Sequence, residues 1–292
     1  MSIGKFIFKT LIKVSYYFTK VKLSYIKKGN YNIAYIKSKK FKNSTTIIFI
    51  HGLNDQKTTW LKLIKLINSK YNIVAIDLLG HGQSSKPLNF DYSLTSQADF
   101  LEGVIKDIIS KEKIDSFYLA GHSMGGGIAT LLANRLNIKK LLLFAPYGIE
   151  VKPSKMKLKA IESKKGKDIW KNICTLEKLK NTLKDLYYKA PKLPNFILKE
   201  FVKSKCKNSK IENKVIDALV DDNLNTKDNL TKEAKNIESK TLIFWGEDDF
   251  VIDISSAYAF KSTIKNSTLY TYKECGHMLH MERAKEIAKE IV

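Results

Sequence analysis

The order of apolar and polar positions along the chain predicts an alternation of strands and helices. Several apolar runs are uninterrupted, which is typical of strands buried on both faces of a parallel sheet. These runs are residues 45–50, 71–76, 116–120 and 140–144. Helical spacing marks the segments near 58–67, 95–111 and 127–136. Repeated strand-helix units of this kind predict an α/β protein with a mostly parallel central sheet flanked by helices.

The pattern changes after Pro146. Residues 147–237 contain no good strand, are rich in lysine and carry apolar residues at helical spacing. Strands return at 241–245 and 268–272, and a helix is expected from about residue 279. We therefore predict a core of residues 23–146 and 238–292, interrupted by a helical cap at 147–237. Two strand-like runs around a Gly/Asn turn at 27–31 predict a leading hairpin within this core.

Residues 1–22 have the pattern of a basic amphipathic helix. On a helical wheel Ile3, Ile7, Leu11, Val14, Phe18 and Val21 form one stripe, opposite Lys5, Lys9, Lys13 and Lys20. These lysines leave no apolar run long enough for a signal peptide or a membrane span, so we expect neither export nor insertion through this segment. Two interpretations stay open: the stripe lies in a membrane interface, or it packs on the protein itself or a partner.

The amino-acid composition indicates which kinds of partner the protein is suited to bind. The net charge of the 292 residues is +22, and nearly all of the excess is lysine, because arginine occurs only at Arg135 and Arg283. This argues against sequence-specific nucleic-acid binding, which relies on arginine, and suits an anionic membrane surface, although a compositional bias toward Lys, Asn and Ile is the favoured explanation. Cys174, Cys206 and Cys275 lack metal-ligand spacing. The default compartment is the cytoplasm, with a peripheral position on the inner membrane face through residues 1–22 as the alternative.

A Gly-x-Ser-x-Gly sequence lies between a predicted strand and a predicted helix, at Gly121, Ser123 and Gly125. This is the context of a nucleophile elbow, a sharp turn that presents a serine at the carboxyl edge of a sheet. Ser123 is therefore the candidate nucleophile, and the Met124 backbone N–H is placed to stabilise an oxyanion. The alternative is a glycine-rich turn with a capping serine and no chemistry.

A serine nucleophile needs a base, and the base needs a carboxylate to orient it. Of the five histidines, His277 lies on a loop after the last predicted strand, from which it can reach back over the sheet edge. The carboxylate is expected after the strand at 241–245, where Glu247, Asp248 and Asp249 are adjacent. The residues alone do not choose among these three.

Several short motifs together resemble the α/β-hydrolase superfamily from about residue 30 to the end of the chain. They are His51-Gly52, the run from Asp77 to Ser84, Gly121 to Gly125, Trp245-Gly-x-x-Asp249 and Gly276-His277. The resemblance implies that Asp249 is the triad acid, that the Leu53 N–H is the second oxyanion donor and that Asp77 is structural. Residues 190–196 and 274–282 look more narrowly like the monoacylglycerol-lipase and esterase branch, whose members often have a membrane-associating N-terminus.

The resulting prediction is a serine hydrolase that cleaves carboxylic esters of lipid-like or other apolar acyl substrates through an acyl-enzyme. Its triad is Ser123, Asp249 and His277, with Leu53 and Met124 as oxyanion donors. No metal and no organic cofactor is implied. The alternatives are a carbon–carbon bond hydrolase of the same fold and a non-catalytic binding module that retains the fold.

Overall fold

A mixed eight-stranded sheet forms the centre of the molecule in the computed structural model, which describes residues 3–41, 44–221 and 223–292. The strands are β1 (Val21–Lys28), β2 (Tyr31–Ser38), β3 (Thr46–Ile50), β4 (Asn72–Ile76), β5 (Phe117–His122), β6 (Lys140–Phe144), β7 (Lys240–Gly246) and β8 (Ser267–Tyr272). Their order in the sheet is β1-β2-β4-β3-β5-β6-β7-β8. The hairpin β1–β2 is antiparallel, β2 pairs antiparallel with β4, and the remaining pairs are parallel.

The apolar runs in the sequence correspond to the buried strands. Every residue of β3 and β4 is buried, as expected for central strands covered on both faces. The edge strand β1 instead alternates between exposed and partly buried positions. The predicted α/β fold class with a mostly parallel sheet is thus confirmed.

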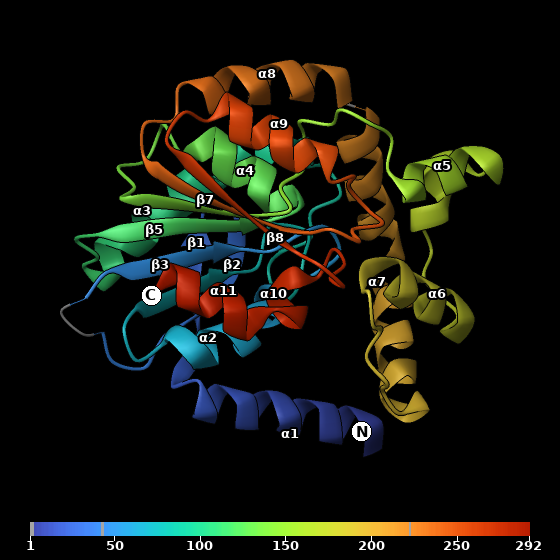
Figure 1. The fold of residues 1–292 in the computed structure, drawn as a ribbon. Helices are drawn as coiled ribbons and strands as arrows, with labels where there is room; N and C mark the ends of the chain where they lie inside the picture. Colours follow the sequence, from blue (N-terminus) through green and yellow to red (C-terminus); the bar gives the residue numbers. More distant parts are fainter. Residues whose placement is uncertain (1–2, 42–43, 222) are drawn as a thin grey trace.

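Helices cover both faces of the sheet (Figure 1). They are α1 (Ile3–Phe18), α2 (Leu61–Ile67), α3 (Leu94–Glu112), α4 (Met124–Leu132), α5 (Lys155–Glu162), α6 (Leu176–Leu186), α7 (Asn195–Asp221), α8 (Asn223–Lys235), α9 (Ser255–Thr263), α10 (Leu279–Glu282) and α11 (Ala284–Ile291), with 3₁₀ turns η1 (Lys57–Trp60) and η2 (Gly166–Trp170). Helices α3, α4, α8 and α9 form one layer, and α2 and α11 lie on the other face, with α1 outside α2.

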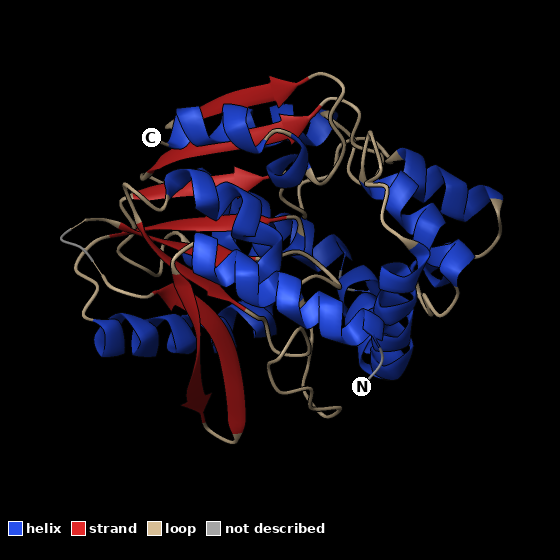
Figure 2. Cartoon of the chain, turned by 90° about the horizontal axis from the view of Figure 1, so that it is seen from below, coloured by secondary structure: helices blue, strands red, loops and turns tan. Residues whose placement is uncertain are grey.

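The segment between β6 and β7 is helical in the residues that the structure describes. Figure 2 shows the helices α5 to α7 grouped beyond the arrowheads of the parallel strands, so this segment lies at the carboxyl edge of the sheet. Helix α8 behaves differently, because it packs on α4 and α9 in the layer that covers the sheet. The apolar residues Ile173, Leu179 and Leu198 form a small core of their own between α6 and α7.

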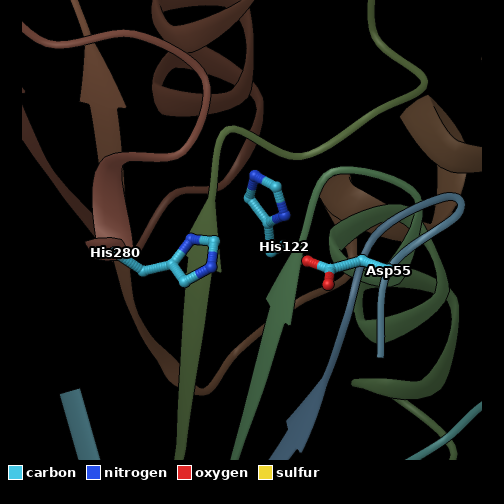
Figure 3. Close-up of side chains that lie close together, drawn as sticks. All are labelled: Asp55, His122 and His280. Atoms are coloured by element: carbon cyan, nitrogen blue, oxygen red, sulfur yellow. The ribbon is translucent and has the colours of Figure 1, made fainter. Parts of the chain in front are cut away.

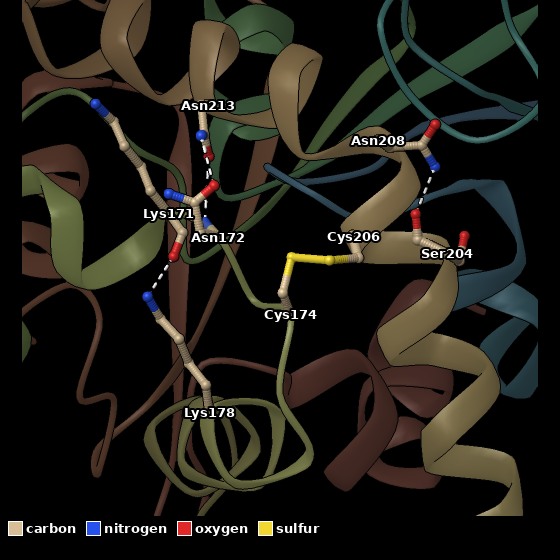
Figure 4. Close-up of a disulfide and its surroundings, with 8 residues drawn as sticks. All are labelled: Lys171, Asn172, Cys174, Lys178, Ser204, Cys206, Asn208 and Asn213. Carbon is tan, nitrogen blue, oxygen red and sulfur yellow. Dashed lines mark hydrogen bonds between the residues drawn. A yellow bond between two sulfur atoms is a disulfide. The ribbon is translucent and has the colours of Figure 1, made fainter.

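A disulfide between Cys174 and Cys206 joins the loop before α6 to α7 (Figure 4). Next to it, Asn172 and Asn213 exchange a hydrogen bond of 2.8 Å from the Asn213 amide to the Asn172 side-chain oxygen. The sequence did not indicate this pair.

The N-terminal helix is shorter than the sequence pattern suggested. Helix α1 ends at Phe18, and Val21 is the first residue of β1 and is buried, so its assignment to the helical stripe was wrong. The helix turns into the strand at Lys20, whose φ is 54°. The side chains of residues 3–6, 8 and 9 lie outside the described part of the structure.

Candidate active site

Ser123 stands at the turn between β5 and α4 with backbone angles of φ 52° and ψ −121°. A residue with a Cβ in this region carries strain of about 1–3 kcal/mol, which persists only where the surroundings impose it. Here the Ser123 N–H donates to the carbonyl of Phe144, and the Ser123 carbonyl accepts from the N–H groups of Gly126 and Tyr147, each within 2.9 Å. The neighbouring strand and helix therefore hold the serine in the strained elbow conformation.

The two glycines of the motif allow strand and helix to pass closely. A Cβ on Gly121 would lie 2.2 Å from the carbonyl oxygen of Gly125, and one on Gly125 would lie 2.3 Å from the carbonyl oxygen of His51. No side chain fits at such distances without moving the backbone. The sequence motif is thus a packing requirement of this turn.

His277 and Asp249 lie together at the same edge of the sheet. The Nδ1 of His277 is 2.7 Å from Oδ2 of Asp249, and both side chains are buried. Because a carboxylate accepts, Nδ1 donates, and in a neutral imidazole this leaves the lone pair on Nε2. The other oxygen of Asp249 accepts from the N–H groups of Val251 at 2.8 Å and Ile252 at 3.0 Å, which fixes the carboxylate.

The other two acids of the loop point elsewhere. Glu247 and Asp248 are exposed, and Glu247 accepts a hydrogen bond of 2.9 Å from the Thr271 hydroxyl. Of the three carboxylates that the sequence left open, the structure brings Asp249 to His277.

The elbow and the base loop touch through His122. Its Nε2 lies 2.9 Å from the carbonyl oxygen of His277, and the two rings are 4.7 Å apart between centroids. The residue preceding the candidate nucleophile thus holds the backbone of the candidate base. The loop after β3 closes the third side, because a Cβ on Gly52 would lie only 3.1 Å from Cβ of Ser123. The predicted donors Leu53 and Met124 lie on this loop and at the start of α4.

Four of the five histidines are unsuited to act as a base. Burial lowers the pKa of His51, His81 and His280 to about 3 and that of His122 well below its ordinary value. In addition, Nε2 of His51 accepts from the Leu78 N–H at 3.0 Å. His277 remains.

Asp77 is part of a buried structural group. One oxygen accepts from the Lys57 N–H at 2.7 Å, and the other accepts from the Lys57 ammonium at 2.6 Å and the Gln83 N–H at 2.7 Å. These bonds join the loop after β4 to η1. They leave Asp77 away from His277, in agreement with a structural role.

Glu282 is a residue of this region that the sequence reasoning missed. Its carboxylate accepts from the N–H groups of Gly276 at 2.9 Å, Tyr188 at 3.3 Å and Lys189 at 3.1 Å. It therefore ties the loop that carries His277 to the chain that leaves α6. The sequence signal was weak: an acid five residues after a candidate base, at the end of a short helix.

The fold and this site define the class to which the molecule belongs: an α/β protein with a serine at a strand-to-helix elbow and a histidine–carboxylate pair beside it. The chain belongs to the alpha/beta hydrolase fold family, whose model matches residues 45–284. The resemblance seen in the sequence is thereby confirmed.

Among similar proteins are monoacylglycerol lipases. Monoacylglycerol lipase abhd6-A of Xenopus laevis is 27% identical, over 96% of this chain and 85% of its own length. The human monoacylglycerol lipase ABHD6 is 24% identical, over 97% of this chain and 86% of its own. The crystal structure of a membrane phospholipase A, described as a bacterial virulence factor, superposes with a TM-score of 0.88, at 24% identity, over 99% of this chain and 90% of that one.

Proposed function

We propose that this protein is a serine hydrolase that cleaves carboxylic esters of lipid-like acyl substrates through an acyl-enzyme. The observation that carries the proposal is the 2.7 Å contact between Asp249 and His277 beside the strained elbow of Ser123. A strained serine with an oriented imidazole next to it is the arrangement that activates a hydroxyl for attack on a carbonyl. The names of the relatives, which are lipases of monoacylglycerols, support the substrate class.

In the proposed reaction Ser123 Oγ attacks the ester carbonyl while Nε2 of His277 takes the hydroxyl proton. The Met124 and Leu53 N–H groups stabilise the resulting oxyanion. His277 then gives the proton to the departing alkoxide, which leaves Ser123 acylated. Water, deprotonated by the same imidazole, hydrolyses the acyl-enzyme and returns the serine. Throughout, Asp249 keeps Nδ1 protonated and stabilises the imidazolium.

The proposed lid comprises α5, η2, α6 and the first half of α7. These helices lie beyond the carboxyl ends of the strands, and Glu282 ties the end of α6 to the loop of His277. Exposed apolar side chains occur in this segment, with Ile161 on α5 65% exposed and Val151 in the chain before α5 59% exposed. A lid with apolar surface next to the site suits an acyl chain and excludes water.

Two alternatives to an ester hydrolase are a carbon–carbon bond hydrolase and a non-catalytic binding module. Activity on different substrates distinguishes all three. A panel of p-nitrophenyl and glycerol monoesters with acyl chains of increasing length should be hydrolysed, with a preference for chains longer than acetyl. A vinylogous diketone, the substrate type of carbon–carbon bond hydrolases, should not be turned over. Turnover of the diketone without ester hydrolysis would establish the first alternative, and inactivity of the folded protein on both would favour a binding module.

We further propose that α1 attaches the enzyme to an anionic membrane surface. Among the described residues no helix is long and apolar enough to cross a bilayer. On α1, Leu11, Val14 and Phe18 are 50%, 45% and 59% exposed. The helix contacts its own protein through another face, on which Tyr16 packs against the main core. The exposed stripe and the net charge of +22 support interfacial binding over packing of the stripe on the protein.

Changing Leu11 and Phe18 together to Gln is expected to release the enzyme from vesicles that contain anionic lipid. Both side chains are exposed, so the melting temperature should stay within about 2 °C of the wild type, because exposed substitutions have small effects on stability. Co-sedimentation with vesicles of different anionic lipid content and at different salt concentrations measures this. Leu88→Gln, at another exposed leucine, is the control. Unchanged sedimentation, or a large loss of stability, would contradict the proposal.

A further inference from the structure

Lys205, on the lid helix α7, reaches across to the loop after β3, which carries the proposed oxyanion donor Leu53. Its ammonium donates a hydrogen bond of 2.6 Å to the carbonyl oxygen of Asn54, the residue that follows Leu53. The two bonded residues are 151 positions apart in the sequence, so no local pattern could have indicated this bond. At this point the lid contacts the proposed oxyanion loop directly.

The core of the protein fixes the peptide bond between Gly52 and Leu53. Nε2 of His51 accepts from the Leu78 N–H, so in the neutral ring Nδ1 carries the proton and donates to the Gly52 carbonyl at 2.7 Å. In a trans peptide the carbonyl and the N–H point in opposite directions, so this bond also sets the direction of the Leu53 N–H. Within the part of the chain that the structure describes, that N–H donates to no protein group. It is therefore available to a ligand beside Ser123.

The loop beyond Leu53 needs a further restraint. Asn54 has a φ of 55°, in the left-handed region, which residues with a side chain adopt mainly where their surroundings impose it. The N–H of the next residue, Asp55, closes the turn only by a long hydrogen bond of 3.4 Å, and the Asp55 side chain turns inward, toward His122 (Figure 3). The bond from Lys205 is shorter and charge-assisted, and it is therefore a main restraint on this turn.

Lys205 is itself fixed, as a positioning residue must be. Its side chain is 19% exposed, and its ammonium lies 3.4 Å from the carboxylate of Glu212, which is 13% exposed and lies about two turns further along α7. The next residue, Cys206, is joined by the disulfide to Cys174, which anchors the helix at this point. A free lysine side chain loses much rotamer entropy when it is ordered, and these two restraints reduce that cost.

We propose that Lys205 is a positioning residue for the oxyanion donor of Leu53. By holding the Asn54 carbonyl, the ammonium keeps the turn, and with it the Leu53 N–H, in the direction that His51 sets. Lys205 acts through this loop and not by contact with the reacting atoms. The inference rests on the proposed ester hydrolysis. An oxyanion donor contributes most when it is fixed before the charge develops, so loss of the restraint affects the transition state more than it affects substrate binding.

The test compares Lys205→Met with Lys203→Met on a p-nitrophenyl acyl ester. Methionine has a stem of similar length but cannot donate, so Lys205→Met is expected to lower kcat by roughly 10- to 100-fold and to change KM by less than about threefold. Lys205→Arg, which can still donate to a carbonyl, should retain most of the activity. Lys203 lies on the same helix, is 65% exposed and pairs with Glu200, so Lys203→Met is the matched control and should behave as the wild type does.

A trifluoromethyl ketone inhibitor separates positioning of the donor from a general effect on the lid. A serine adds to such a ketone and forms a hemiketal oxyanion, which needs the same donors as the transition state. In Lys205→Met the inhibition constant should rise by roughly the factor by which kcat/KM falls. A loss confined to KM, an unchanged inhibition constant or an equal loss in Lys203→Met would each overturn the proposal.

Removal of Lys205 leaves the Glu212 carboxylate unpaired, so the melting temperature of each variant is measured. If Lys205→Met does not fold, the double variant Lys205→Met/Glu212→Gln, which removes both charges, takes its place. Amide hydrogen exchange of residues 51–57 provides a readout without catalysis and should be faster once the restraint is lost. A wild type that hydrolyses no ester would refute the proposed function, whereas unchanged exchange in the folded variant would refute the role of Lys205.

Discussion

Ser123→Ala and His277→Ala are each expected to lower kcat on a p-nitrophenyl acyl ester by roughly 10⁴- to 10⁶-fold. The serine supplies the attacking oxygen, and the imidazole removes its proton, so neither can act without the other. The double variant should therefore lose little more than either single one. Steady-state rates, with the substrate above KM, measure this.

A loss of activity is informative only in a variant that is folded. Ser123 and His277 are buried or partly buried at the meeting point of three loops, so the melting temperature of each variant is measured in parallel. Ser262→Ala, at an exposed serine on α9, is the control and should retain full activity. Additive losses in the double variant would show that the two residues do not work as a unit.

Asp249→Asn is expected to lower kcat by about 10⁴-fold. An asparagine can present its amide N–H to Nδ1 of His277, and this favours the tautomer with the proton on Nε2, which cannot accept the proton of Ser123. Substrate binding should change much less, because Asp249 is buried behind the imidazole. The comparison of kcat with KM separates these two effects.

The neighbouring acids provide matched controls for this substitution. Glu247→Gln and Asp248→Asn alter exposed carboxylates one and two positions away and should reduce kcat only slightly, because neither contacts His277. Equal losses at Asp248 and Asp249 would mean that the loop adopts another conformation in solution. A fully active Asp249→Asn variant would remove the carboxylate from the mechanism.

The sequence predicts those features that are local. The elbow could be found because its glycines are required by contacts within a few residues, such as that between Gly121 and the carbonyl of Gly125. The buried strands could be found because burial on both faces leaves an uninterrupted apolar run, as in β3. The helices α5, α6, α7 and α8, which lie between β6 and β7, follow from periodicity in the same way.

Features made by distant residues could not be predicted in this way. The contact between Asp249 and His277 is decided by the paths of two loops, and the residues alone left three acids open. The disulfide joins cysteines 32 residues apart, across a helix whose direction the sequence does not define. The role of Glu282 depends on tertiary packing in the same sense, because its carboxylate binds the backbone of residues distant in sequence.

The central claim is that Ser123 is an activated nucleophile, and covalent labelling by a fluorophosphonate tests it most directly. The phosphorus is attacked by a serine only when a neighbouring base removes its proton, so labelling reports activation and not exposure. The labelled residue is identified by digestion and mass spectrometry. We predict one labelled serine, Ser123, no label in Ser123→Ala and strongly slowed labelling in His277→Ala. A label on another serine, or an unchanged labelling rate in His277→Ala, would contradict the account.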